Sequence, residues 1–257
     1  MRKKTKDKRI KTDGVHRMLV AGLDTITRAH SHGVFLVDLE PAKAFIERYH
    51  QEHGITLSYD FLILRACALA LPHHPEITLM LKGSKLVQCG SIDIGVSVAG
   101  KGNIAPVAVI EDADKKSLPE LRELYKKKVR QARREEEENL RKMNRIVRWI
   151  PGSFIRKLII IPFVRSQKLR RKYVGNFQIT STSAPFGEFH LPNTISTAFL
   201  LSSGGISKRI MVVDDKPAVR LSVYLVGQID HRVLDGEKPF KFCLELKDLL
   251  EHPEKLA

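Results

Sequence analysis

The chain has 257 residues, 43% of them hydrophobic, and a formal net charge of +15. This length allows one domain with a sizeable core, and the hydrophobic content is ordinary for a globular protein. Three scattered cysteines without a CxxC pair exclude a disulfide framework and indicate a reducing compartment, so we expect a cytoplasmic protein.

Residues 1–11 form a basic tail with seven Lys or Arg and one Asp. No apolar h-region follows the tail, which excludes a secretory signal. Residues 15–29 have an amphipathic helical pattern, and Arg17 lies near its start. Phe35, Val37 and Leu39 then stand at every second position, which predicts a short strand.

Two further helices are expected. Pro41 favours a helix start and Gly54 a helix end, and a strongly apolar run at 59–71 is closed by Pro72. Cys67 lies in this run, so we expect it in the core and not as a nucleophile.

Two histidine pairs, His30 with His32 and His73 with His74, raise the question of a metal site. No cysteine or carboxylate stands at ligand spacing from either pair, so we expect no metal.

Residues 92–98 and 104–109 predict paired strands around the sequence Gly-Lys-Gly at 100–102, which lacks the glycine pattern and following helix of a phosphate loop. Ser117 and Glu120 then have the spacing of a capping box. The helix that they open carries an apolar stripe past residue 140.

A segment over about 126–172 holds most of the positive charge, with 17 Lys or Arg and four Glu, a net +13. The tail adds +6, so the rest of the chain is slightly acidic, at about −4. The basicity therefore lies in two appendages, which we expect to be a tail and a helical insertion.

Within the insertion, residues 146–164 mix aliphatic and aromatic side chains with cations. The stretch is too interrupted to span a bilayer, which needs about 20 mostly apolar residues. It could lie on an anionic membrane surface, cover a neighbouring subunit, form a lid over an acyl chain, or simply pack on its own domain. The dominance of aliphatic residues and the lack of a recognised module argue against nucleic acid.

Four strands are expected in the second half of the chain. They cover residues 176–182, 197–203, 210–213 and 220–226, and a hairpin turn at 214–217 precedes the last strand. A final helix follows, with apolar residues at helical spacing up to Pro253, namely Phe240, Leu244, Leu246, Leu249 and Leu250.

The junction between the last strand and the last helix contains the candidate site. His231 and Asp235 stand four residues apart there, so a helical turn would place them on one side. Histidine, with an ordinary pKa of about 6.5, can take a proton from a thiol and return it. A buried histidine that only satisfies hydrogen bonds is the alternative. The density of ionisable groups, which also include Asp230 and Arg232, favours a functional site because burying them is costly.

The sequence DHRVLDG at 230–236 resembles the signature of the dihydrolipoyl acyltransferases, the core subunits of 2-oxo-acid dehydrogenase complexes, whose fold chloramphenicol acetyltransferase shares. Residues 14–21, 92–109, 112–118 and 242–256 resemble further parts of that family. The resemblance implies an α/β fold, an α+β two-layer sandwich of a mixed sheet flanked by helices, in a catalytic domain at 12–257. No lipoyl or peripheral-subunit-binding domain is expected on this chain.

The resemblance also implies a coenzyme A-dependent acyltransferase that moves an acyl group between thiols. His231 would be the general base, and Thr180 matches by position the family's serine that stabilises an oxyanion, with Ser181 and Ser183 as rivals. Asp235 would hold the motif turn through an ion pair to Arg17, and Arg232 would support the site.

Two departures from the family imply an altered substrate or a weakened site. Residues 182–185 intervene before Phe186-Gly187, and Gln228-Ile229 replaces the usual Ser-Tyr.

The expected assembly is a homotrimer, or a larger cage of trimers, with the active site in a channel between subunits. The substrate would be a coenzyme A thioester, and a lipoyl carrier on another chain is the alternative acceptor. Two other functions stay open. One is a catalytically silent trimeric scaffold, and the other is an acyltransferase with a lipid-like substrate that binds the periphery of a membrane through 146–164.

Overall fold

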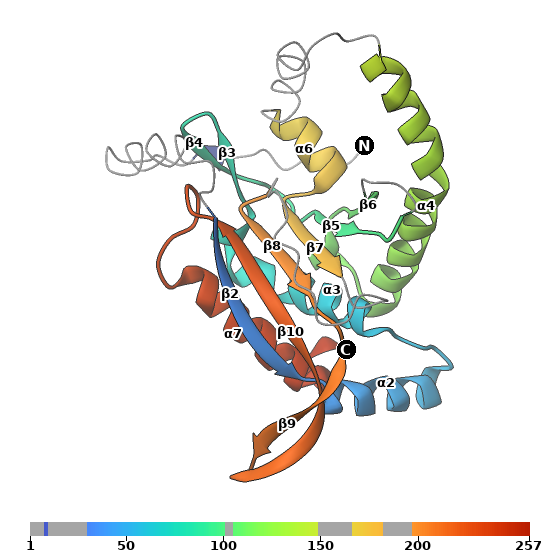
Figure 1. Cartoon of the computed structure of the whole chain (residues 1–257), viewed down its shortest axis with the longest axis vertical. Coiled ribbons are helices and arrows are strands. Elements are labelled where there is room, and N and C mark those ends of the chain that lie inside the picture. The colour runs from blue at the N-terminus through green and yellow to red at the C-terminus, as the bar shows by residue number, and fades with distance from the viewer. Residues whose placement is uncertain (1–7, 10–29, 101–104, 149–165, 182–196) are drawn as a thin grey trace.

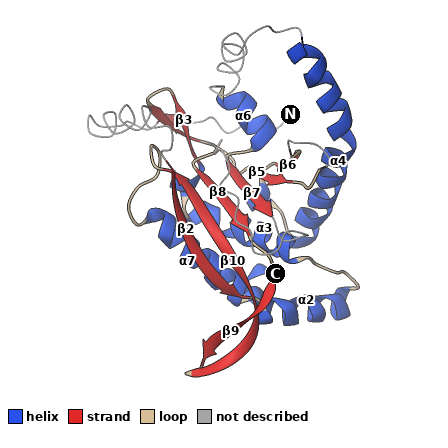
Figure 2. Cartoon of the chain, in the orientation of Figure 1, coloured by secondary structure: helices blue, strands red, loops and turns tan. Residues whose placement is uncertain are grey.

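A seven-stranded mixed sheet forms the centre of the computed structural model, with helices on its flanks (Figures 1 and 2). The structure describes residues 8–9, 30–100, 105–148, 166–181 and 197–257, and at 8–9, 139–141 and 143–148 it describes the backbone alone. The expected mixed sheet with flanking helices is therefore confirmed.

The sheet has the strand order β2-β10-β8-β7-β5-β6, and β9 pairs with the first half of β10. Its pairs are antiparallel except β5 with β7 and β7 with β8, which are parallel. The strands are β2 (His30–Asp38), β5 (Ile94–Ser97), β6 (Val107–Ile110), β7 (Phe177–Ser181), β8 (Phe199–Ser203), β9 (Ser207–Val213) and β10 (Lys216–Asp230). A second sheet joins β1 (Lys8–Arg9), β4 (Lys85–Gln88) and β3 (Leu79–Lys82).

The helices begin and end at the residues that local chemistry favours. Pro41 lies in the first turn of α2 (Glu40–His53), and Gly54 ends it with a positive φ of 67°. The Ser58 side chain caps α3 (Tyr59–Ala70), and the Ser117 backbone and hydroxyl both donate to Glu120 at the start of α4 (Leu118–Arg148). The other helical elements are α6 (Gln167–Val174), α7 (Lys238–Glu251), η1 (Leu71–His73), η2 (Pro75–Thr78), η3 (Ala113–Lys115) and η4 (Pro253–Leu256).

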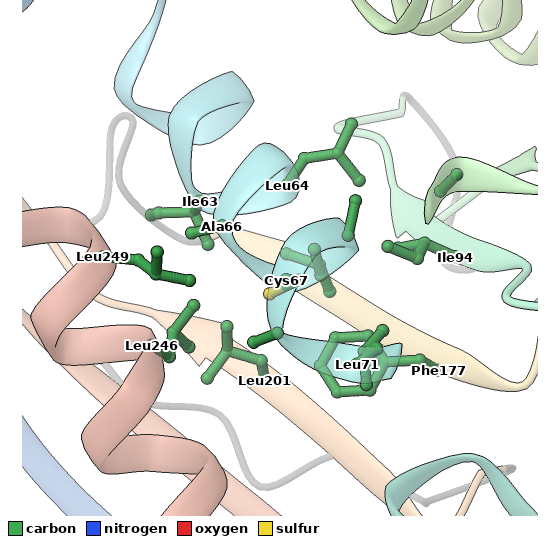
Figure 3. Packing of buried hydrophobic residues seen from close by; sticks show 14 of the residues in the cluster. Ile63, Leu64, Ala66, Cys67, Leu71, Ile94, Phe177, Leu201, Leu246 and Leu249 are labelled. Atoms are coloured by element: carbon green, nitrogen blue, oxygen red, sulfur yellow. The ribbon is translucent and has the colours of Figure 1, made fainter. Parts of the chain in front are cut away.

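The main core lies between one face of the sheet and helices α3 and α7. Figure 3 shows Phe177 and Leu201 from the sheet near the buried residues of these helices. The rings of Phe177, Phe199 and Phe242 contact one another at centroid distances of 5.2 to 5.6 Å. Cys67 is fully buried, as predicted, and burial raises the pKa of its thiol. Burial likewise raises the pKa of Cys243 to about 12, and a thiol with a raised pKa is a poor nucleophile.

The opposite face of the sheet is lined by uncharged polar side chains that are also buried. Because side chains alternate along a strand, Phe177 and Ile179 face the core, whereas Gln178 and Thr180 point the other way. Ser202 and Gln228 extend the same polar face on the neighbouring strands. We call the four residues Gln178, Thr180, Ser202 and Gln228 the polar face.

Two details of the predicted elements were wrong. The turn between β9 and β10 is only Asp214-Asp215, both with positive φ, while Lys216 and Pro217 already belong to β10. In α7, Phe240 and Leu244 are 62% and 67% exposed, so the inward stripe consists of other residues, namely Phe242, Leu246, Leu249 and Leu250. The helix predicted at 15–29 lies outside the described residues.

None of the helices in the described ranges is long and apolar enough to cross a membrane. The predicted helix at 118 and beyond runs unbroken to Arg148. The remainder of the basic and apolar stretch at 146–164 lies outside the described residues.

Candidate active site

The turn after β10 is anchored by its backbone and by two buried aliphatic residues. The Asp230 carbonyl accepts the N–H of Val233 at 2.8 Å and that of Leu234 at 3.0 Å. Both side chains are buried, with 9% and 2% exposure. The anchoring holds His231 at the end of the strand, at the junction that the sequence predicts.

His231 and Asp235 both face solvent on the outer side of this turn. The His231 Nδ1 atom lies 3.8 Å from Asp235 Oδ1, which is too long for a hydrogen bond. Asp235 instead accepts the N–H of Gly236 at 2.7 Å, and Gly236 has a φ of +73°. The turn thus leaves the imidazole, whose side chain is 37% exposed, accessible to an incoming thiol.

The other two ionisable groups of the motif bind each other. Arg232 donates to the Asp230 carboxylate from Nε at 2.9 Å, from Nη2 at 2.8 Å and from its backbone N–H at 3.0 Å. Asp230 is buried, so this fork of hydrogen bonds satisfies a charge that would otherwise be costly. Burial lowers the pKa of His30 nearby, and the positive charge of Arg232 adds to that effect while Asp230 opposes it.

Helix α6, which lies in the basic segment at about 126–172, approaches the same region. Burial lowers the pKa of the Arg170 guanidinium, while the charges of Cys89 and of Asp230, the residue before His231, raise it. Its Nη2 also donates to the carbonyl of Leu81 at 2.8 Å.

Strand β7 is fixed at its start by a glycine and a buried asparagine. Gly175 has a φ of +82°, and a Cβ there would lie 2.3 Å from the Asp93 carbonyl oxygen. The Asn176 side chain accepts the N–H of Asp93 at 2.9 Å and donates to the carbonyl of Ser91 at 2.6 Å. These contacts, which we call the asparagine lock, set the register of β7 against β5.

In that register Thr180 lies between Ser97 of β5 and Ser202 of β8, which gives three hydroxyl side chains in one row across the sheet. Thr180 is 9% exposed, and its hydroxyl makes no hydrogen bond to any residue that the structure describes. The Thr180 hydroxyl is therefore free to donate a hydrogen bond to the oxygen of a bound ligand.

Ser181 points to the opposite, core-facing side of β7, where its hydroxyl hydrogen-bonds the carboxyl group of Asp60. Burial raises the pKa of Asp60, and this hydrogen bond partly offsets the effect. Of the three residues considered for the oxyanion role, Thr180 therefore lies on the polar face and Ser181 on the core face. Ser183 lies outside the described residues.

Thr180 and His231 cannot meet within one chain. Thr180, Ser202 and Val226 occupy one row of the sheet, and His231 lies five residues beyond Val226 along the chain. At about 3.3 Å per residue this is roughly 16 Å along the strand, in addition to two strand spacings. A reaction that uses both side chains therefore needs two copies of the chain.

One of the two histidine pairs binds a carboxylate. His73 and His74 lie 2.7 Å from the two carboxylate oxygens of Glu245, and no group of three metal-ligating residues occurs in the described ranges. Arg17, the predicted partner of Asp235, lies outside those ranges.

Sequence reasoning missed three features of the site. These are the mutual pairing of Asp230 and Arg232, the asparagine lock at Asn176, and Gln178 on the polar face. The alternation of Gln178 and Thr180 with aromatic and aliphatic residues is a signal for the third.

The fold is shared with chloramphenicol acetyltransferase and with the core of a dehydrogenase complex. Chloramphenicol acetyltransferase superposes with a TM-score of 0.54 at 13% identity, over 95% of this chain and all of that chain. The cubic core of a pyruvate dehydrogenase multienzyme complex superposes with a TM-score of 0.63 at 22% identity, over 96% of this chain and 93% of that one.

Among proteins of this fold, the chain belongs to the family of the 2-oxoacid dehydrogenases acyltransferase catalytic domain, whose model matches residues 4–141 and 193–257. The predicted resemblance is thereby confirmed. A relative from Bartonella vinsonii subsp. berkhoffii, the dihydrolipoyllysine-residue succinyltransferase component of the 2-oxoglutarate dehydrogenase complex, is 25% identical over 218 residues, 84% of this chain. The chain spans 45% of the length of that relative. The family match leaves out residues 142–192, which include α6 and β7.

Proposed function

We propose that the protein transfers an acyl group between thiols at a site built from two copies of the chain, with His231 from one copy and Thr180 from the next. The observation that carries this proposal is the separation of the two side chains by roughly 16 Å along the sheet of a single chain. Family membership and the names of the curated relatives support the reaction type.

The chemistry needs a base because a thiol with a pKa of about 8–9 is mostly protonated at neutral pH. His231 removes the thiol proton, and the sulfur forms a bond to the carbonyl carbon of a thioester. The Thr180 hydroxyl donates to the oxygen on which negative charge develops. The intermediate then releases the other sulfur, which takes the proton back from His231.

The proposed substrates are a coenzyme A thioester and a second thiol. The relatives are named for a dihydrolipoyllysine residue, so a lipoyl carrier on another chain is the protein acceptor that we propose beside free thiols. No metal is needed for any step. The setting that we propose is cytoplasmic, on the ground that the sequence has three scattered cysteines and no CxxC pair.

The proposed assembly is a homotrimer, or a cage built from trimers. One structural neighbour is the cubic core of a multienzyme complex. The chain itself exposes apolar side chains on the β9–β10 hairpin, which projects away from the rest of the molecule in Figure 1. Such side chains are typical of a surface that another subunit covers.

A mixed-subunit assay tests the shared site. His231→Ala and Thr180→Ala variants are prepared separately, then unfolded and refolded together in equal amounts, and transfer from a labelled coenzyme A thioester is measured. Each variant alone is expected to lose at least about 100-fold in rate. In random mixed trimers about a quarter of the sites receive both intact side chains, so about a quarter of the wild-type rate returns.

The exposed Lys85→Ala variant controls for handling, and wild-type protein refolded alone sets the reference rate. No recovery in the mixture, with active wild type, rejects the shared site. A well-folded trimer that never turns over any thioester rejects the enzyme and favours the scaffold. Flotation on anionic liposomes, with and without residues 146–164, tests membrane attachment, which equal behaviour of the two proteins would exclude.

A further inference from the structure

A buried glutamine on the polar face carries an oxygen without a partner. Gln178 is 8% exposed, and its side-chain Oε1 makes no hydrogen bond to any residue in the described part of the chain. The other end of the amide, Nε2, lies 3.5 Å from the Ser97 hydroxyl, at the outer limit of a hydrogen bond. A native core rarely leaves a buried amide oxygen unpaired, because the lost hydration is not replaced.

The position of this oxygen relates it to the proposed reaction centre. Gln178 precedes Thr180 by two residues on the same strand and points to the same face, so their Cα atoms are about 7 Å apart. The row that contains Gln178 also contains Leu200 and Gln228, while the row of Thr180 contains Ser97 and Ser202. None of these five neighbours of Gln178, namely Thr180, Leu200, Gln228, Ser97 and Ser202, has a charged side chain. Such a surface suits a ligand with neutral amides and hydroxyls, not one with charged groups.

We propose that Gln178 binds the substrate, with Oε1 accepting a hydrogen bond from the amide N–H nearest to the sulfur of a pantetheine-type thiol. This inference rests on the proposed function, because it takes Thr180 as the donor to the thioester oxygen.

The lengths of the two candidate thiols favour a pantetheine arm. In pantetheine two methylene groups separate the sulfur from the first amide nitrogen. With the reacting carbonyl at Thr180, this short spacing lets the amide nitrogen reach Gln178, which lies one strand repeat of about 7 Å away. In a lipoyl group a longer alkyl chain separates the sulfurs from the amide, which would place the amide beyond Gln178. Gln178 thus distinguishes coenzyme A from a lipoyl thiol.

Binding of coenzyme A by calorimetry tests the inference on the full chain. Methionine has nearly the volume of glutamine but no strong acceptor, so Gln178→Met removes the hydrogen bond and keeps the packing. We expect coenzyme A to bind the Gln178→Met variant about 3 to 10 times more weakly, the usual worth of one hydrogen bond. Gln131→Met, on the exposed side of α4, is the matched control and should bind as wild type does.

Thermal unfolding without ligand provides a second readout. Because Gln178 is poorly satisfied in the folded chain, Gln178→Met should leave the Tm unchanged or raise it, whereas a structural glutamine would lower it. A third readout compares thioesters of N-acetylcysteamine, which has the amide, and of butanethiol, which lacks it. The wild-type preference in kcat/KM for the first should fall about 3- to 10-fold in the variant.

Equal coenzyme A affinity for wild type and Gln178→Met overturns the inference, and so does a clear loss of Tm in the variant. A wild type that binds no coenzyme A also overturns it. These results leave the proposed function standing as long as wild type transfers acyl groups and the mixed trimers recover activity. Failure of those two assays rejects the function itself.

Discussion

The hydroxyl of Ser181 hydrogen-bonds the carboxyl of Asp60, which joins the end of β7 to the first turn of α3. Asp60 is partly buried. Burial raises the pKa of the Tyr125 phenol, and the charge of the Asp60 carboxyl group raises it further. The contact fixes Ser181 on the core side of the strand. The next residue back, Thr180, is thereby held on the polar face, where the proposed chemistry takes place.

Asp60 should make stability depend on pH. Burial raises its pKa in the folded chain, so the folded state binds the proton more tightly than the unfolded state. Its contribution to stability is therefore complete below the ordinary pKa of about 3.9 and is lost as the pH rises through the raised value. We expect Asp60→Asn to gain stability relative to wild type between about pH 4 and pH 7, as measured by urea unfolding at one protein concentration.

Ser181→Ala serves as the companion variant. Removing the hydrogen bond that lowers the pKa of Asp60 should raise that pKa further and steepen the pH dependence. If the free energy of unfolding of both variants changes with pH as it does in wild type, Asp60 does not titrate as we infer.

Breaking the buried Asp230–Arg232 pair should be costly. Arg232→Leu leaves the Asp230 carboxylate buried without its fork of donors, and we expect a loss of about 3 kcal/mol in the free energy of unfolding. The rate should also fall, because this pair shapes the turn that carries His231. Urea unfolding and the thioester assay measure the two effects.

The exposed pair of Glu237 and Lys241 offers a control for the buried one. Lys241→Ala should leave stability unchanged within error, since such surface pairs contribute little. A similar small effect of Arg232→Leu would show that the carboxylate finds water or another donor.

The sequence predicted the elements well where local chemistry decides them. The cap at Ser117 with Glu120, the stop at Gly54 and the strand before His231 all follow from nearest-neighbour rules. The β3–β4 hairpin was missed, although Gly83-Ser84 between two apolar runs is a turn signal.

The arrangement of the site could not be predicted, because it depends on register. The separation of Thr180 from His231 follows from how β7, β8 and β10 pair, and a shift of one residue would turn Thr180 to the other face. The exposure of the Phe240 side chain could not be predicted from the sequence either. Periodicity finds apolar positions, yet it does not tell which of them face the same chain and which face solvent or another copy.

The β9–β10 hairpin should hold the assembly together. Ile210 and Val219 pair directly across it and are 77% and 66% exposed. Ile210→Asp places a charge in this apolar surface, and we expect association to weaken by at least about 30-fold, the effect of a central contact of about 2 kcal/mol. Sedimentation at several concentrations measures it, with Lys85→Glu on the β3–β4 hairpin as control. An unchanged mass would assign the interface to another surface.

The docking of α6 should depend on a glycine in the sheet. A Cβ at Gly95 would lie 1.9 Å from the Val174 carbonyl oxygen at the end of α6, and backbone cannot move aside as a side chain can. We expect Gly95→Ala to cost at least about 2 kcal/mol of stability, through overpacking. Gly54→Ala is the matched control, because its Cβ meets nothing within 4 Å and only the positive φ costs about 1 kcal/mol.

Gly95 also pairs with Gln178, so the displaced helix end should disturb the polar face. Gly95→Ala is therefore expected to weaken coenzyme A binding in calorimetry as well as to lower the urea midpoint, whereas Gly54→Ala lowers the midpoint alone. Equal coenzyme A affinity for the two variants would show that α6, which the family match leaves out, packs on the sheet without shaping the proposed thiol site.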